Sequence, residues 1–157
     1  MKIKLIAVGT KMPDWVDKTY KNYAQRLPKD CSMELIEITA AKRTKNQLAS
    51  LWMEKEGQQI LKSLDASDWV VALDVQGKSW STEQLADQIT QWQHKGCNVA
   101  LLVGGPDGLS AECLKRANVR WSLSALTLPH PMVRVLLSET IYRAWSVTVN
   151  HPYHRAR

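Results

Sequence analysis

The sequence predicts an α/β fold with a mostly parallel sheet flanked by helices. Two observations indicate this class. Compact apolar runs alternate along the chain with stretches of helical periodicity, which is the order of elements in α/β layer architectures. The apolar runs alternate little with polar residues, so the sheet should be covered on both faces. Because no repeat or linker interrupts the 157 residues, we expect one domain that covers residues 1–157.

The five compact apolar runs are the expected strands. They cover residues 3–8, 33–39, 69–74, 98–103 and 121–126. The first run starts almost at the N-terminus and is too short and too interrupted by lysine for a signal peptide. We therefore interpret it as the first strand of the sheet.

The expected helices fill the gaps between these strands. They cover residues 13–26, 46–64 and 81–96, a short stretch from Ser110, and a last helix that starts around Pro131 and ends at about residue 150. Ser81 and Gln84 have the spacing of a capping box, in which each side chain satisfies a backbone amide of the other residue. Gly96 should end that helix, and Pro131 suits a first helical turn.

The composition is that of an ordinary soluble protein with a basic balance. Hydrophobic residues make up 45% of the chain and the net charge is +6, which favours a polyanionic partner. No apolar run approaches the ~20 residues of a membrane span. Cys31, Cys97 and Cys113 are widely spaced and form no C-x-x-C pair, so the sequence predicts neither disulfides nor a zinc site. These features fit the cytoplasm.

Three segments at expected strand ends have unusual composition. They cover residues 73–79, 103–108 and 122–131, and ligands of parallel sheets bind beyond the carboxyl ends of the strands. The second segment places three glycines within five residues, which lets the backbone approach a ligand closely. The third carries small and hydroxyl residues and should leave the sheet as an extended chain before its prolines. A plain turn between strand and helix is the alternative for each segment.

The first segment has a loose likeness to a phosphate-binding P-loop that would end at Ser79. Physical chemistry argues against this interpretation. Ala72 occupies the place of the first glycine, Asp74 would repel phosphate, and the β-branched Val75 would stand in the bend. The sequence therefore disfavours a nucleotide hydrolase and favours a simple turn here.

The C-terminal half carries motifs that resemble one known family. The motifs are GGPDGLS at residues 104–110, SLSALTLPH at residues 122–130 and RVLLSETIYRA at residues 134–144. The start of the chain, residues 5–11, and the tail, residues 150–155, match as well. The sequence as a whole resembles the ribosomal RNA large subunit pseudouridine methyltransferase H family of the SPOUT class.

This resemblance implies properties that composition and periodicity do not. It implies a SPOUT fold with a C-terminal trefoil knot, a homodimer, and S-adenosyl-L-methionine as cofactor. It also implies methylation of N3 of a pseudouridine in 23S ribosomal RNA, with the assembled 70S ribosome as substrate. The cofactor positions implied by the resemblance lie in the three segments above and are Leu73, Gly104, Leu123, Ser124, Ala125, Leu126, Thr127 and Leu128.

The acceptor chemistry indicates where catalytic residues should lie. A sulfonium-bound methyl group is already activated, but an imide N3–H is a poor nucleophile until a base or an anion-stabilising group assists it. Glu139 and Arg143 share a helix face and are candidates, although a plain intrahelical ion pair explains their spacing equally well. Tyr153, His154 and Arg155 follow on a tail that we expect to be mobile. The resemblance implies a composite site, in which one subunit's pocket meets the other's tail; it requires no metal.

Two alternatives stay open at the level of the sequence. A ribosome-binding or assembly factor would explain the basic charge but would not need three ligand segments. A P-loop hydrolase would need nucleotide binding at the first segment. His130, between two prolines, is expected to fix its loop by a hydrogen bond.

Overall fold

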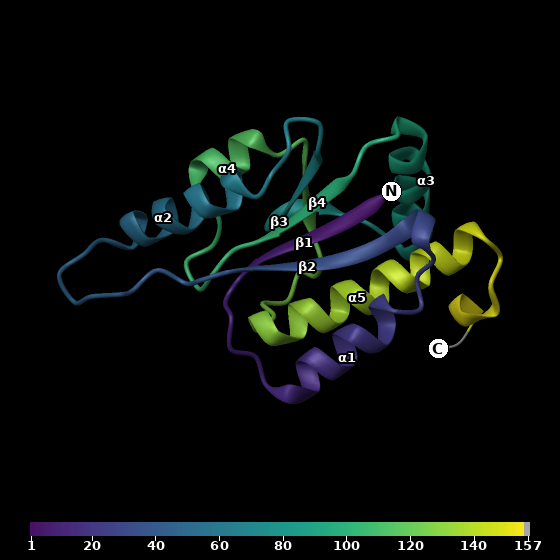
Figure 1. Cartoon of the computed structure of the whole chain (residues 1–157), viewed down its shortest axis with the longest axis horizontal. Coiled ribbons are helices and arrows are strands. Elements are labelled where there is room, and N and C mark those ends of the chain that lie inside the picture. Colours follow the sequence, from purple (N-terminus) through teal and green to yellow (C-terminus); the bar gives the residue numbers. More distant parts are fainter. Residues whose placement is uncertain (156–157) are drawn as a thin grey trace.

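The computed structural model describes residues 1–155 and contains one five-stranded sheet (Figure 1). The strands are β1 (Lys2–Val8), β2 (Ser32–Ile38), β3 (Trp69–Ser79), β4 (Val99–Val103) and β5 (Val119–Ser122). Their order in the sheet is β2-β1-β4-β3-β5, and every pairing of neighbouring strands is parallel. The predicted α/β class with a parallel sheet is confirmed.

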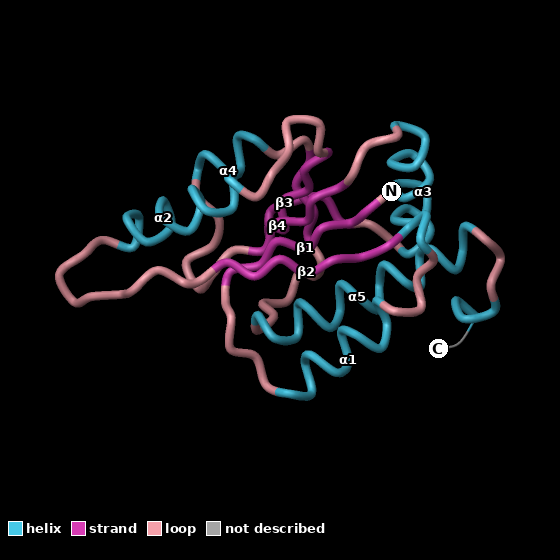
Figure 2. The backbone as a smooth tube through the Cα atoms, viewed as in Figure 1, coloured by secondary structure: helices cyan, strands magenta, loops and turns pink. Residues whose placement is uncertain are grey.

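Helices cover both faces of the sheet, as the apolar strands required (Figure 2). The helices are α1 (Asp14–Ala24), α2 (Ala49–Lys62), α3 (Thr82–Lys95), α4 (Ala111–Arg116) and α5 (His130–Thr148), with short 3-10 helices η1 (Lys29–Cys31) and η2 (Pro152–Arg155). Helices α2 and α4 lie on one face, and α1, α3 and α5 lie on the other (Figure 1).

Strand β1 shows how the two hydrophobic cores arise from one sequence. Successive side chains of a strand point to opposite faces. Leu5 packs in the core beneath α1, α3 and α5, whereas Ile6 packs in the core beneath α2 and α4. Both side chains are fully buried, as are nearly all residues of β1 and β4. A strand buried on both faces has no polar side to alternate with, which is why β4 is continuously apolar and the buried part of β1 is interrupted only by Lys4, whose ammonium pairs with Asp65 and Asp68.

The local helix signals of the sequence are confirmed. The Ser81 hydroxyl accepts a hydrogen bond from the Gln84 amide at 3.1 Å, and the Gln84 side chain accepts one from the Ser81 amide at 2.9 Å. Gly96 ends α3 in the left-handed conformation with φ +70°. Ser110 caps α4. Such signals are reliable because each depends on residues within one turn of the helix.

Strands β3 and β5 differ from their predicted ranges. Strand β3 continues to Ser79, and β5 spans only Val119–Ser122 instead of residues 121–126. Trp121 pairs with both Leu73 and Lys78, so the chain between those two residues bulges out of the ladder and then rejoins it. At the point of return, a Cβ on Gly77 would stand 2.6 Å from the Trp121 nitrogen, so this close approach needs glycine.

Candidate functional site

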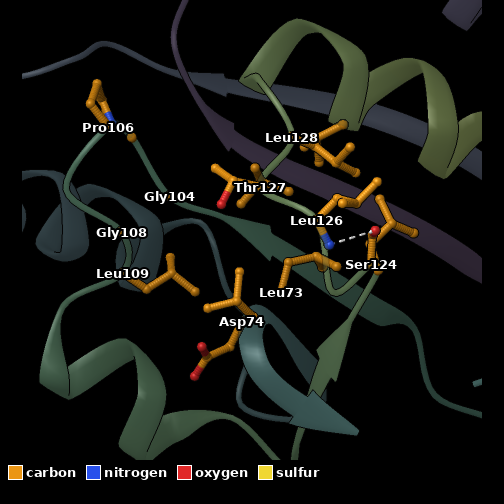
Figure 3. A pocket seen from close by; sticks show the side chains of 15 residues that line it. Leu73, Asp74, Gly104, Pro106, Gly108, Leu109, Ser124, Leu126, Thr127 and Leu128 are labelled. Carbon is orange, nitrogen blue, oxygen red and sulfur yellow. Dashed lines mark hydrogen bonds between the residues drawn. The ribbon is translucent and has the colours of Figure 1, made fainter. Parts of the chain in front are cut away.

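A cavity of about 270 Å³ opens at the carboxyl ends of β3, β4 and β5 (Figure 3). Its walls come from the end of the regular part of β3, from the glycine-rich loop after β4, and from the segment that follows β5. Val133 of α5 completes the lining. The volume is close to the lower end of the range for small-molecule sites, and the position matches the general rule for parallel sheets.

Seven of the eight predicted cofactor residues meet at this cavity. They are Leu73, Gly104, Leu123, Ser124, Leu126, Thr127 and Leu128. Ala125 belongs to the same segment but does not line the cavity. The fold thus brings together residues that lie up to 55 positions apart in the sequence, because the three strand ends are neighbours in the sheet.

The glycine-rich loop after β4 forms one wall of the cavity from backbone. Gly105 and Gly108 pair as an isolated antiparallel bridge, and the Gly108 amide donates to the Gly105 carbonyl at 2.9 Å. A Cβ on Gly104 would stand 2.5 Å from the Gly108 carbonyl carbon and 2.8 Å from the Leu109 nitrogen. No side chain fits at Gly104, so the main chain itself faces the cavity.

The segment after β5 bends away from the sheet by means of its hydroxyl groups. The Ser124 hydroxyl accepts a hydrogen bond from the Leu126 amide at 2.9 Å (Figure 3). The Ser122 hydroxyl donates to the Ser124 carbonyl at 3.1 Å. Local bonds of this kind compete with strand pairing, which explains why β5 ends at Ser122 and the predicted strand over residues 121–126 is wrong at its C-terminal end.

The charged side chain among the described residues that line the cavity is an aspartate. Asp74 lines the cavity, and its carboxylate accepts from the Gln76 amide at 3.1 Å and lies 3.7 Å from Arg120. Among the described residues that line the cavity there is no lysine or arginine. This chemistry suits a ligand with hydroxyl groups or positive charge and disfavours a phosphate. In addition, Lys78 lies within β3, so the segment does not form a P-loop.

Sequence reasoning missed the role of several lining residues. Asp74 and Val75 were considered only as obstacles to a phosphate, and Val133 was not singled out. Val133 could have been found from its position, because it lies one turn into the helix that follows the third ligand segment. Asp74 carried a clear signal, since it directly follows the apolar part of a strand.

The predicted catalytic residues Glu139, Arg143 and Tyr153 form a second cluster, the first two on α5 and the third on η2. The Arg143 Nε donates to the Glu139 carboxylate at 2.8 Å, and its Nη2 lies 2.7 Å from the same oxygen in an ion pair. The Tyr153 hydroxyl donates to the same Glu139 oxygen at 3.1 Å, and the Arg143 guanidinium lies 4.9 Å from the Tyr153 ring centre. Burial, together with hydrogen bonds to Tyr23 and Glu139, raises the pKa of Tyr153 above its ordinary value. Tyr153 therefore stays a protonated donor.

The tail folds back on α5, although the sequence predicted mobility. Residues Pro152–Arg155 form η2, and the Tyr153 ring packs 4.6 Å from the Tyr142 ring, centre to centre. His154 keeps a buried Nδ1 atom without a hydrogen-bond partner among residues 1–155. Arg155 donates to the Asn150 side chain at 3.3 Å. Ala156 and Arg157 lie outside the described residues.

Within one chain the cluster and the cavity lie at different places along α5. Val133 lines the cavity near the start of the helix, whereas Arg143 is ten residues further on, which corresponds to roughly 15 Å of helix axis. The tail follows beyond the far end of α5 (Figure 1).

Two further features bear on the class of site. Among residues 1–155, no three His, Cys, Asp or Glu side chains lie close enough together to hold a metal ion. No helix in this part of the chain has the length and apolar character needed to cross a membrane.

Comparison with known proteins identifies the family. Residues 1–154 match the family model described as "Predicted SPOUT methyltransferase". Proteins named "Ribosomal RNA large subunit methyltransferase H" from Marinomonas sp. (strain MWYL1) and Hahella chejuensis (strain KCTC 2396) are each 57% identical over 155 residues. That alignment covers 99% of this chain in both cases, and 100% and 99% of the relatives.

A solved structure adds a likeness of fold. The structure of a probable methylase family protein from Haemophilus influenzae Rd KW20 superimposes with a TM-score of 0.54 over 97% of this chain and 69% of that chain. At 14% identity, this likeness concerns the fold alone. The family model and the full-length relatives show that the chain belongs to the SPOUT methyltransferase family.

Proposed function

We propose that this chain transfers a methyl group from S-adenosyl-L-methionine to N3 of a pseudouridine in 23S ribosomal RNA. The observation that carries the proposal is the full-length 57% identity to proteins named ribosomal RNA large subunit methyltransferase H. The cavity supports it, because it lies where the sequence motifs of that family meet. The net charge of +6 supports a polyanionic substrate, which we propose is the assembled 70S ribosome in the cytoplasm.

The chemistry of the cavity fits the proposed cofactor. Leucine side chains of β3 and of the segment after β5 offer apolar walls for a flat purine ring, and the loop that begins at Gly104 packs tightly enough to form a further wall from backbone. Asp74 offers a carboxylate to ribose hydroxyl groups or to a cation. The bound cofactor supplies a methyl group already activated on a sulfonium sulfur. We assign its binding to Leu73, Gly104, Leu123, Ser124, Leu126, Thr127 and Leu128, with Ala125 spacing the last segment.

The acceptor requires groups that this chain carries on α5 and its tail. Arg143 is oriented by Glu139 and would stabilise the negative charge that develops on the uracil-like ring as N3 loses its proton. Tyr153 remains a hydrogen-bond donor beside it. The buried Nδ1 of His154 has no hydrogen-bond partner among residues 1–155 and would receive a proton, and Arg155 can bind phosphate.

A homodimer would bring these two sites together. In one chain, α5 separates the cavity from the tail cluster by several helical turns. A two-fold axis across α5 would place the tail of each subunit beside the cavity of the other. In such an isologous interface the start of α5 in one subunit lies beside the end of α5 in its partner. We therefore propose a composite active site in which one subunit holds the cofactor and its partner supplies Arg143 and the tail.

The first experiment measures methyl transfer to the proposed substrate. Labelled S-adenosyl-L-methionine is supplied with 70S ribosomes from a strain that lacks this gene, and the labelled nucleotide is identified. We expect label on N3 of one large-subunit pseudouridine, and its loss when residues 153–157 are deleted. Transfer that survives the deletion would remove the tail from the mechanism. Absence of both transfer and cofactor binding would favour a ribosome-binding factor that lacks enzymatic activity.

A mixing experiment tests the composite site. Gly104→Ala should displace the backbone that forms the cavity wall and Arg143→Ala should disable the cluster, so each variant alone should be inactive. When the two are unfolded together and refolded, about half the dimers are mixed, and each mixed dimer holds one intact site. A composite site therefore predicts recovery of roughly one quarter of the wild-type rate. Recovery of no activity would mean that cavity and cluster act within one chain.

A further inference from the structure

Beside the cavity, the fully buried Arg134 is held by three acceptors from different parts of the fold. Its Nη1 donates to the Glu37 carboxylate at 2.7 Å and its Nη2 donates to the Gly9 carbonyl at 2.6 Å. Its Nε donates to the ring nitrogen Nε2 of His130 at 3.0 Å. Glu37 lies near the end of β2, Gly9 directly follows β1, and His130 begins α5. A buried guanidinium thus ties two strand ends to the start of the helix.

The contact with Arg134 fixes the proton on the His130 ring. An arginine Nε carries a hydrogen and can only donate, so Nε2 of His130 must present its lone pair. The ring is therefore neutral and carries its hydrogen on Nδ1. This leaves Nδ1 to donate to the backbone of Gly104, an interaction that raises the pKa of His130 and partly offsets its lowering by burial. Gly104 is the glycine of the cavity wall that no side chain can replace.

We propose that Arg134 and His130 are positioning residues that hold the Gly104 loop in its cofactor-binding form. The chain of hydrogen bonds runs from Glu37 and Gly9 through Arg134 and His130 to the cavity wall. Neither side chain lines the cavity, so both act through Gly104. This inference rests on the proposed binding of S-adenosyl-L-methionine at that wall.

The arrangement makes the cavity sensitive to acid. A proton on Nε2 of His130 would confront the Nε–H of Arg134, so two donors and two positive charges would meet and the bond would be lost. Burial and the Arg134 charge lower the pKa of His130 from its usual value, whereas the Gly104 bond and Glu37 raise it and do not reverse the shift. Since the cofactor-binding form requires neutral His130, affinity should be constant above the ordinary histidine pKa and should fall as the pH drops through the lowered one.

The test compares cofactor affinity over a pH series for the full-length protein. Calorimetry measures the Kd of S-adenosyl-L-methionine between about pH 5 and pH 8 for wild type and His130→Gln. A glutamine amide can accept from Arg134 and donate to Gly104 but does not titrate. We expect similar affinities near pH 8 and, near pH 5, a loss of ~10-fold in the wild type that His130→Gln does not show. Titration of the ligand itself is common to both proteins and cancels in the ratio.

Controls separate this inference from the proposed function. His94→Gln removes an exposed histidine of α3 and should keep the wild-type pH profile. His130→Ala lacks both hydrogen bonds and should bind ~10-fold more weakly at every pH. An identical acid limb in wild type and His130→Gln would overturn the positioning role, as would ring nitrogen shifts in NMR that place the His130 proton on Nε2. Failure of wild type to bind the cofactor near pH 8 would instead refute the proposed function, and the positioning role with it.

Discussion

The cavity at the strand ends and the cluster on α5 and η2 differ in composition: the first is mostly backbone and apolar side chains, the second is made of charged and polar side chains. Backbone, glycine and leucine form most of the cavity, and its only charged lining residue among those described is Asp74. The cluster consists of an arginine, a glutamate and a tyrosine joined by two hydrogen bonds and an ion pair of 2.7–3.1 Å. A cavity made of backbone fixes shape, whereas a cluster of charged side chains supplies charge. The difference suits a reaction in which one reactant is already activated and the other must lose a proton.

This comparison predicts that variants of the two regions fail in different ways. Changes at the cavity should weaken cofactor affinity and thereby methyl transfer. Changes at the cluster should reduce methyl transfer and leave cofactor affinity intact, because the cluster does not line the cavity.

The largest effect is expected at Gly104. In Gly104→Ala the new Cβ would stand 2.5–2.8 Å from backbone atoms of Gly108 and Leu109, so the loop must shift. We expect cofactor affinity to fall by ~100-fold or more, with methyl transfer lost. Gly96→Ala is the matched control: its Cβ meets nothing within 4 Å, although its φ of +70° makes alanine strained. It should lower the free energy of unfolding by about 1 kcal/mol and leave affinity unchanged. Normal affinity in a folded Gly104→Ala would contradict a cavity wall made of backbone.

A loss of catalysis alone is expected for Arg143. Arg143→Ala removes the guanidinium that Glu139 orients, and methyl transfer should fall by ~100-fold while the cofactor Kd stays within about twofold. Arg26→Ala removes an arginine whose guanidinium lies 5.6 Å from the Tyr142 ring centre, near the same aromatic group, and serves as the control. If Arg143→Ala weakened cofactor binding as much as methyl transfer, the assignment of cofactor binding to the cavity and of catalysis to the cluster would be wrong.

A smaller loss is expected for the Tyr153 hydroxyl. Tyr153→Phe keeps the ring against Tyr142 and removes only the bond to Glu139, so methyl transfer should fall by about 5-fold, as for one hydrogen bond. Because the pKa of Tyr153 lies above its ordinary value, the phenol keeps its proton beyond about pH 10, where a free tyrosine loses it. Rate profiles of wild type and Tyr153→Phe should therefore be parallel up to that pH. A fall in rate below that pH, present only in the wild type, would show that Tyr153 loses its proton there and would contradict its role as a protonated donor.

The accuracy of the sequence predictions depended on how far apart the deciding residues lie. Ser81, Gln84 and Gly96 were placed correctly because a helix cap is decided within a few residues. The end of β3 was misplaced because the bulge between Leu73 and Lys78 results from pairing with Trp121, some 45 residues away in the sequence, which local pattern does not encode.

The candidate site shows the same dependence on sequence distance. The three strand ends could be predicted to carry a ligand, because parallel strands bring their carboxyl ends to one edge. Strand order is a tertiary property, so the sequence did not show that β3, β4 and β5 bring their three segments to one cavity; Asp74 and Val133 carried positional signals that were not used. Arg134 likewise binds Glu37 and Gly9, which lie 97 and 125 positions away from it in the sequence, so local spacing does not predict these two contacts.

The smallest effect is expected at Ser124, and it tests whether the cavity depends on shape alone. Ser124→Ala removes the hydroxyl that accepts from the Leu126 amide at 2.9 Å, while the backbone and the leucine walls stay. Because one local hydrogen bond contributes about 0.5–1.5 kcal/mol, cofactor affinity should fall only ~3-fold. Ser63→Ala loses a comparable hydroxyl bond at the end of α2, to the Gln59 carbonyl at 3.0 Å, and should leave affinity unchanged. A loss at Ser124 as large as that at Gly104 would mean that the hydroxyl contacts the ligand directly, and the cavity would then recognise its ligand through side-chain chemistry as well as backbone shape.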